Sequence, residues 1–447
     1  MSALGRRGGD GTTGSAWVNE RLAVDLPTGA HRLAGLAVRR NPRRAHLIVS
    51  RVLGKHIPVD PRVAITAGGR LGDRVARTLE PVRASGSGPA VGRPGAGQPG
   101  DGPLVLGYAE TATALGHLVS DALPGSRYLH STRRQVPGFT PAGEFDEVHS
   151  HATGHLLLPA DPRWLRAGST VVLVDDELST GRTAAATIRA LQAIHPRRRY
   201  VIATLLDLRG PADRAELDAL AGELAAEISV VSLAAGPVGL PADILERGQR
   251  LVAALDPDRV DAPPGEPTDA PAPVEEILIR VPAGLPAGGR HGFAAGHRAG
   301  LTALVDQAAE QVAARVPEQA RVLVLGTEEF MYTPMRLAGA LLGRRGGPVR
   351  YSSTTRSPVL AVNDPGYAIR TRLTFPAHDA PADCPVGRYV YNVAPAVPAG
   401  RFDHIVVVVD GAADTPQLRS PGGLVEVLRP HCDGVTVVAL PESELTL

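Results

Sequence analysis

Residues 171–183 read VVLVDDELSTGRT. Four apolar residues typical of a buried strand lead into two adjacent carboxylates, Asp175 and Asp176, and then into a small, hydroxyl-rich turn that opens an alanine-rich helix. In an open parallel sheet, ligands bind at the carboxyl ends of the strands. A helix N-terminus also offers free N–H groups and a positive dipole to an anion. The segment therefore predicts a phosphate site beside a pair of carboxylates.

We expect a division of labour within this segment. Asp175 and Asp176 would hold two ribose hydroxyls, directly or through a metal ion, and Gly181 would allow the backbone to approach a ligand closely. The residues expected around the phosphate are Ser179, Thr180, Gly181, Arg182 and Thr183. An ordinary strand followed by an aspartate N-cap explains one carboxylate and one hydroxyl, but not the whole order of residues.

The sequence around this segment alternates between strand-like and helix-like stretches, which favours a doubly wound parallel sheet. The strands expected here are 104–106, 126–130, 170–174, 200–207 and 230–234. The expected helices are 113–123, 183–194 and 212–228, with another in 43–53, where Asn41-Pro42 provides an N-cap and a proline at the first helical position.

The C-terminal part predicts a second α/β domain. Its expected strands are 277–281, 321–325, 349–353, 388–393, 404–409 and 435–440, and apolar residues at helical spacing predict a helix over 301–316. Two Gly/Pro/Ala-rich stretches interrupt the pattern, 84–103 as a disordered insertion and 256–274 as a linker. We therefore expect a disordered tail over 1–15, one domain over 16–255 and another over 275–447.

Composition narrows the class of protein. The formal net charge is only +1, which predicts neither nucleic acid nor an anionic membrane as a partner. The two cysteines, Cys384 and Cys432, form no zinc or redox motif, and no apolar run reaches the length of a membrane span. These observations predict a cytoplasmic protein.

Residues 171–183 resemble the signature with which type I phosphoribosyltransferases bind 5-phosphoribosyl-1-pyrophosphate (PRPP). The resemblance implies their fold, transfer of ribose 5-phosphate from PRPP to a nitrogenous base with release of pyrophosphate, and Mg²⁺ as cofactor, held at Asp175 and Asp176, directly or through water. In the purine-salvage branch an aspartate precedes Thr-Gly, whereas Ser179 stands here. That departure argues against a purine acceptor.

The resemblance assigns further residues. Gly107, Tyr108, Ala109 and Glu110 follow a strand, where these enzymes keep a pyrophosphate-binding loop. The polar segment 127–159 corresponds to their flexible loop over the site. In it, the candidates for neutralising pyrophosphate are Arg133 and Arg134, and those for proton transfer are Glu147, His149 and His151. A zinc site at His149, His151 and His155, or a merely solvated lid surface, is the alternative.

More of the chain resembles one narrower group, the orotate-type phosphoribosyltransferase-like proteins of bacterial tellurium-resistance and stress gene clusters. The resemblance is carried by residues 41–59, 107–117 and 147–157, together with 171–183. That group carries a C-terminal Thr-Arg-Ser-Pro signature, here Thr355, Arg356, Ser357 and Pro358. It implies a role in nucleoside-like metabolite biosynthesis, other enzymes of the cluster as partners, and a homodimer. A non-catalytic PRPP sensor or a scaffold is the alternative.

The two halves of the sequence also echo each other. Gly107-x-x-Glu110 recurs as Gly326-x-x-Glu329, Arg127-Tyr128 followed by Thr132-Arg133 recurs as Arg350-Tyr351 followed by Thr355-Arg356, and 171–175 recurs as 406–410. We therefore hypothesise that the C-terminal domain is a diverged copy whose ribose-phosphate loop has decayed. In that case Thr355, Arg356 and Ser357 form a second anion site. Otherwise they are a polar strand end with an ion pair to an acid such as Glu329.

Overall fold

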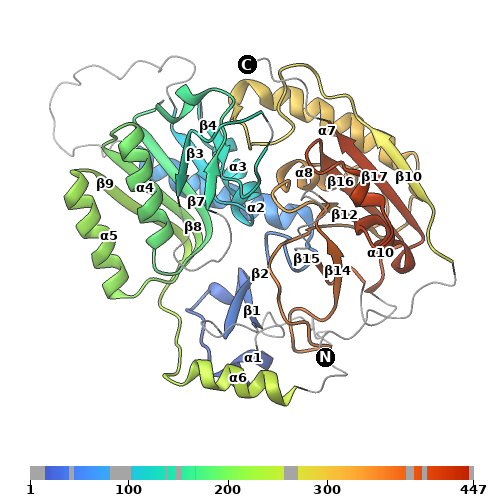
Figure 1. Ribbon diagram of the computed structural model, residues 1–447, viewed down its shortest axis with the longest axis horizontal. Helices are drawn as coiled ribbons and strands as arrows, with labels where there is room; N and C mark the ends of the chain where they lie inside the picture. The colour runs from blue at the N-terminus through green and yellow to red at the C-terminus, as the bar shows by residue number, and fades with distance from the viewer. Residues whose placement is uncertain are drawn as a thin grey trace, which may run out of the picture.

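The computed structural model describes residues 16–39, 45–80, 102–136, 138–145, 154–166, 168–255, 270–378, 387–394 and 400–441 (Figure 1). Its first sheet has six strands. Their spatial order is β11 (Phe293–Ala294), β4 (Arg127–His130), β3 (Leu104–Gly107), β7 (Thr170–Leu178), β8 (Arg199–Asp207) and β9 (Glu227–Ala235). Strands β4, β3, β7, β8 and β9 are parallel. Strand β11, which comes from the C-terminal half of the sequence, pairs with β4 antiparallel.

The second sheet has five parallel strands. Their spatial order is β10 (Val274–Leu278), β17 (Gly434–Leu440), β16 (His404–Asp410), β12 (Val322–Gly326) and β13 (Val349–Ser353). Strands β16 and β17 are buried throughout, as is typical of parallel strands covered on both faces.

Helices connect and cover the two sheets. The longer ones are α2 (Pro61–Leu79), α3 (Ala112–Asp121), α4 (Arg182–Ile194), α5 (Pro211–Leu224), α6 (Ile244–Ala254), α7 (Arg298–Ala313) and α8 (Tyr332–Leu342). The shorter ones are α1 (Ala16–Leu22), α9 (Pro416–Arg419) and α10 (Leu424–Leu428). Within the described ranges no helix combines the length and the hydropathy needed to cross a membrane.

Four neighbouring strands have the same order in both sheets. The order is β4-β3-β7-β8 in the first sheet and β13-β12-β16-β17 in the second, so that the earliest of the four in the sequence lies between the next two. Each half also inserts an antiparallel hairpin between the second and third of these four strands in the sequence. These are β5 (Gly143–Phe145) with β6 (His155–Leu157), and β14 (Arg372–Pro376) with β15 (Gly387–Tyr391). This common order is what the hypothesis of a diverged copy requires.

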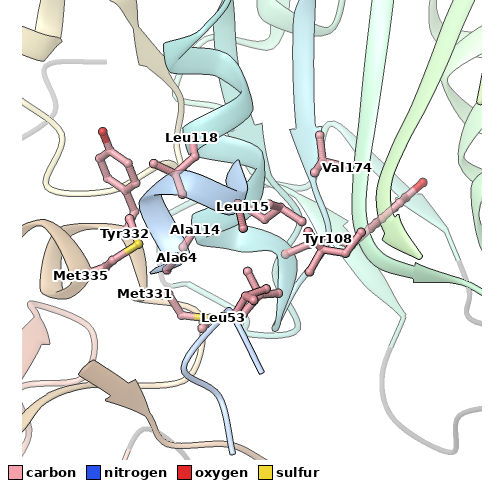
Figure 2. Close-up of a cluster of buried hydrophobic side chains, with 14 of the residues drawn as sticks. Leu53, Ala64, Tyr108, Ala114, Leu115, Leu118, Val174, Met331, Tyr332 and Met335 are labelled. Atoms are coloured by element: carbon pink, nitrogen blue, oxygen red, sulfur yellow. The ribbon is translucent and has the colours of Figure 1, made fainter. Parts of the chain in front are cut away.

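One apolar core runs from one half into the other. Helices α2, α3 and α8 lie between the two sheets in Figure 1, and α8 packs against both α2 and α3. Figure 2 shows Leu115 and Leu118 of α3 and Ala64 of α2 beside Tyr332 and Met335 of α8. The shared core fixes the N-terminal sheet against the C-terminal half, and the candidate site lies close to this contact.

The predicted doubly wound class is confirmed, but one local prediction is wrong. Residues 46–50 form β2 (His46–Ser50), paired antiparallel with β1 (Ala34–Val38), rather than part of a helix over 43–53. The consecutive apolar residues Leu47, Ile48 and Val49 suit a buried strand, and pairing with β1 outweighs the capping pattern upstream. Helix α5 ends at Leu224, short of the predicted 228, where Ala225 adopts a left-handed backbone with φ +48°.

Candidate functional site

The carboxylate pair lies within β7, which continues past the predicted end at 174 to Leu178. Asp175 pairs in register with Thr204 of β8, and the Asp176 backbone N–H donates to Asp175 Oδ1 over 2.9 Å. Both carboxylates are half-buried. Burial, followed by the charge of Asp176, holds the pKa of Asp175 well above its usual value, and burial also raises the pKa of Asp176 despite the opposing charge of Lys55.

The turn after β7 has the backbone expected of a phosphate cradle. Gly181 takes a left-handed conformation with φ +87° and stands directly before α4. A Cβ at this position would lie 3.0 Å from Leu217 Cδ1. The Arg182 N–H points back to Thr180 Oγ1 over 3.4 Å, and Ser179 and Arg182 are exposed. The predicted phosphate residues therefore form one turn at the N-terminus of a 13-residue helix, and the turn is exposed at Ser179 and Arg182 but buried at Gly181.

The predicted pyrophosphate loop lies beside the carboxylates, because β3 and β7 are neighbours. The Tyr108 N–H donates to the carbonyl of Val174 over 3.0 Å, and the Tyr108 hydroxyl donates to Thr187 of α4 over 2.9 Å. The next residue, Ala109, donates its N–H to Ser131 Oγ over 3.0 Å, and the Ala109–Glu110 peptide is cis. The chain order reverses between β3 and β7, and ligands bind at such switch points of open sheets.

Lys55 joins this group from the segment between β2 and α2. Its Nζ lies 2.6 Å from Thr111 Oγ1 and 3.5 Å from Glu110 Oε2, and its charge acts on Asp176. Sequence reasoning missed this residue. A signal was present, because Lys55 is the only lysine in the sequence while the other 46 basic residues are arginine. A compact ammonium differs from a planar guanidinium in what it can bind, which makes a sole lysine informative.

Arg133 is held by the hairpin that follows β4. Its Nη2 lies 3.1 Å from His155 Nε2, and His155 Nδ1 lies 2.8 Å from the Ser131 hydroxyl that also binds Ala109. The ring of His155 stacks on Phe145 of β5. A continuous polar chain thus connects Arg133 to the loop at Ala109. Glu147, His149 and His151 lie outside the described residues.

The remaining predicted residues lie at the contact between the two halves. Arg134 is buried and pairs with Glu328 over 3.2 Å. Arg356 pairs with both Glu328 and Glu110, at 2.9 Å and 3.4 Å. The Thr355 hydroxyl binds Glu110 and receives the Ser357 N–H. The structure thus brings Thr355 and Arg356 to Glu110 of the predicted pyrophosphate loop.

The interface acids themselves were missed. Glu328 and Glu329 are fully buried, and although burial opposes ionisation, neighbouring arginines lower the pKa of Glu328 and lower that of Glu329 to about 2. The repeat of Gly-x-x-Glu pointed to Glu329, but its partners come from the other half of the sequence, which local patterns do not reveal.

The donor set fits a hard cation shared with substrate oxygens. Across the described ranges no group of three or more His, Cys, Asp or Glu side chains is arranged to hold a metal ion. Mg²⁺ characteristically takes one or two carboxylates and completes its octahedron with water and substrate phosphates. Asp175 and Asp176 provide two such carboxylates beside the switch point.

Comparison with known proteins finds two family profiles that match separate parts of the chain. Residues 33–237 match the family profile described as "Phosphoribosyl transferase", and residues 287–428 match "TRSP domain C terminus to PRTase_2". No curated protein matches the chain.

Solved structures of three adenine phosphoribosyltransferases are similar to parts of the chain. The enzyme from Rhodothermus marinus is 16% identical, with a TM-score of 0.27, covering 46% of this chain and 94% of that one. The Giardia lamblia enzyme, complexed with 9-deazaadenine, is 15% identical, with a TM-score of 0.28, covering 46% and 95%. The Trypanosoma brucei enzyme, in complex with AMP, pyrophosphate and ribose-5-phosphate, is 15% identical, with a TM-score of 0.27, covering 39% and 65%.

Proposed function

From a chain whose residues 33–237 belong to the phosphoribosyl transferase family and whose residues 287–428 are a TRSP domain, we infer transfer of ribose 5-phosphate from PRPP to a nitrogen nucleophile, with release of pyrophosphate. One observation carries the proposal. The carboxylates of β7, the Gly181 turn and the loop after β3 meet at the switch point of one parallel sheet. Such a group can contact the ribose, the 5-phosphate and the pyrophosphate of one molecule.

The residues would act mainly through electrostatics. Departure of pyrophosphate leaves a cationic ribosyl centre, which the carboxylates Asp175 and Asp176 beside the ribose hydroxyls would stabilise. The exposed N-terminus of α4 would hold the 5-phosphate and so fix the ribose in place. Magnesium, when bound with the substrate, would supply positive charge to the leaving group.

Two positively charged side chains of the protein, Lys55 and Arg133, would bind the pyrophosphate leaving group. Lys55 lies at the edge of the predicted pyrophosphate loop, and Arg133 connects through His155 and Ser131 to the amide of Ala109 in that loop. Charged donors of this kind bind phosphate oxygens more strongly than neutral ones do. We propose proton transfer at the acceptor by Glu147 or His149 on the basis of the resemblance alone.

We propose a nitrogenous, base-like acceptor. Ser179 in the place of the purine-salvage aspartate favours an acceptor other than a purine. By resemblance, the product would be a nucleoside-like metabolite made with other enzymes of a tellurite- or stress-resistance cluster, in the cytoplasm. A PRPP sensor or scaffold without turnover is the second candidate. Turnover distinguishes it from an enzyme, because a sensor would bind PRPP without releasing pyrophosphate.

The test is calorimetric titration of the full chain with PRPP and Mg²⁺. The Asp175→Asn/Asp176→Asn variant should lose binding, whereas Asp73→Asn/Asp218→Asn, which removes the same charge from exposed sites on α2 and α5, should not. Pyrophosphate release would then be measured with a panel of nitrogenous bases. A wild-type chain that fails to bind PRPP would refute the proposal, and binding without turnover of any base would favour the sensor.

A further inference from the structure

Glu110 of the predicted pyrophosphate loop is held by the opposite half of the chain. Thr355 Oγ1 donates to Glu110 Oε2 over 2.9 Å, and Arg356 Nε lies 3.4 Å from Glu110 Oε1. The Thr355 and Glu110 side chains are both buried. Thr355 and Arg356 of the Thr-Arg-Ser-Pro signature therefore bind the loop 107–110 of the N-terminal half.

The same contact recurs with the halves exchanged. Thr132 Oγ1 donates to Glu329 Oε2 over 2.6 Å, and the Arg133 N–H donates to Glu329 Oε1 over 2.9 Å. Glu329 stands after β12 as Glu110 stands after β3. Each half thus supplies one glutamate and one Thr-Arg pair to the contact. An interface in which both sides supply the same groups is isologous, the kind found in two-fold dimers.

A second pair of contacts follows the same rule. Residues 54–56 read Gly-Lys-His and residues 289–291 read Gly-Arg-His. Lys55 Nζ lies 3.5 Å from Glu110, and Arg290 Nε lies 3.6 Å from Glu329. Each of these two segments therefore supplies a cation to the glutamate of its own half.

These two segments also cross to the other half. Gly54 lies so close to Tyr351 that a Cβ would come within 2.6 Å of the ring, and Gly289 is equally close to Tyr128, at 2.2 Å. Tyr128 and Tyr351 occupy β4 and β13, the second strands of their halves. Glycine is required at both crossings because any side chain would collide with the ring.

The two halves differ in what fills the switch point. In the C-terminal half, Asp410 takes the place of Asp175 and is bound by Arg290 over 2.8 Å. Glu328, next to Glu329, binds Arg134, Arg356 and Arg388 at 3.2, 2.9 and 2.7 Å. In the C-terminal half, internal ion pairs therefore occupy the places that correspond to Asp175 and to the loop after β3.

We propose that the C-terminal half is an in-chain partner subunit, and that Thr355 and Arg356 are positioning residues for the PRPP site. Thr355 and Arg356 bind Glu110 and so fix the loop 107–110. In that position the backbone amides of the loop can bind pyrophosphate. The inference rests on the proposed function for the identity of the ligand. The positioning itself depends only on contacts within the chain.

Thr355→Val tests the proposal, because valine keeps the shape of threonine and removes the donor to Glu110. We expect PRPP binding in the presence of Mg²⁺ to weaken about fivefold, which is what one hydrogen bond of about 1 kcal/mol corresponds to. In the ligand-free protein, amide exchange of residues 107–112 should become faster. Thr355→Ser, which restores the hydroxyl, should recover both properties.

The matched control is Thr436→Val, which removes a buried hydroxyl 2.8 Å from His404 Nε2 within the C-terminal sheet. It should lose comparable stability and leave both readouts unchanged. The proposal is overturned if the amide exchange rate of residues 107–112 is the same in Thr355→Val as in the control. It is also overturned if the wild type binds PRPP and Thr355→Val binds it with the same affinity. If the wild type binds no PRPP, the proposed function fails, and the exchange comparison still decides the positioning role.

Discussion

The ammonium of Lys55 lies 3.5 Å from the Glu110 carboxylate, within a group that also contains the hydroxyl of Thr111. This pair connects the segment before α2 to the loop after β3. The charge of Lys55 therefore acts on both the predicted pyrophosphate loop and Asp176, where it partly offsets the rise in pKa that burial causes.

Replacing Lys55 should weaken PRPP binding. We expect Lys55→Met to lower affinity at least about tenfold, since a hydrogen bond to a charged group contributes about 1.5–3 kcal/mol. Lys55→Arg should recover only part of the loss, because the planar guanidinium cannot occupy the same small space. Titration calorimetry measures both, with Arg70→Met on the exposed face of α2 as the control. Equal affinity in Lys55→Met and the wild type would exclude the assigned role.

Gly181→Ala should damage the phosphate turn. At φ +87° an alanine costs about 1–2 kcal/mol, and its Cβ would press against Leu217 Cδ1 at 3.0 Å. We expect lower stability in urea unfolding together with weaker PRPP binding. Gly69→Ala in α2, where no atom lies within 4 Å of the new Cβ, should instead stabilise the chain by roughly 0.5–1 kcal/mol. Equal stability and equal PRPP affinity in Gly181→Ala and Gly69→Ala would contradict the role of the Gly181 turn in binding phosphate.

The carboxylate pair should cost stability in the absence of ligand. The pKa of Asp175 is raised in the folded state above its usual value of 3.8, so its contribution to folding is favourable at low pH and is lost as pH rises through the raised value. At pH 8 without Mg²⁺, Asp175→Asn should therefore melt higher than the wild type, by roughly 2 °C for each kcal/mol relieved. The difference should shrink toward pH 4. A variant that melts lower at pH 8 would contradict this account.

The buried acids at the interface should have the opposite effect. Arginines lower the pKa of Glu329 from 4.5 to about 2, so its stabilising contribution is complete above pH 4.5 and is lost as pH falls toward 2. Glu328→Gln removes the anion that Arg356 shares with the buried Arg134 and Arg388, and should cost about 3–5 kcal/mol at pH 7. Glu223→Gln, which breaks an exposed pair with Arg189, should cost under about 1 kcal/mol. Urea unfolding at pH 7 and pH 3 compares them.

The sequence predicts those parts of the fold in which local pattern and tertiary role agree. Strand 404–409 and helix 183–194 fall within one residue of the structure, because a run of largely apolar residues bounded by turn residues leaves few alternatives. Helix α2 was missed although Asp60 caps it and Pro61 begins it. Its buried face includes Ala64, Ala67, Gly68 and Gly72, small residues that bring little apolar surface, and Gly68 and Gly72 let α3 approach closely.

Prediction of the site was limited by sequence distance. Asp175 lies in β7, Gly181 follows β7 and Tyr108 follows the neighbouring β3, so the switch-point rule brings them together without further information. Two partners of Glu110, Thr355 and Arg356, are 245 and 246 residues away, and no spacing rule connects positions so far apart. The repeat of Gly-x-x-Glu and Thr-Arg in both halves was the available clue, and it becomes informative once the halves are seen to face each other.

The pairing of Asp410 with Arg290 has a wider consequence. In an assembly of two identical chains, every substitution appears twice, so neither copy can abandon its chemistry without the other. Covalent fusion removes that obligation. One copy can exchange ligand-binding groups for internal ion pairs and become rigid, while its neighbour stays exposed and reactive. When two similar halves lie in one polypeptide, selection can therefore act on each half separately. One half can be selected for turnover and the other for rigidity.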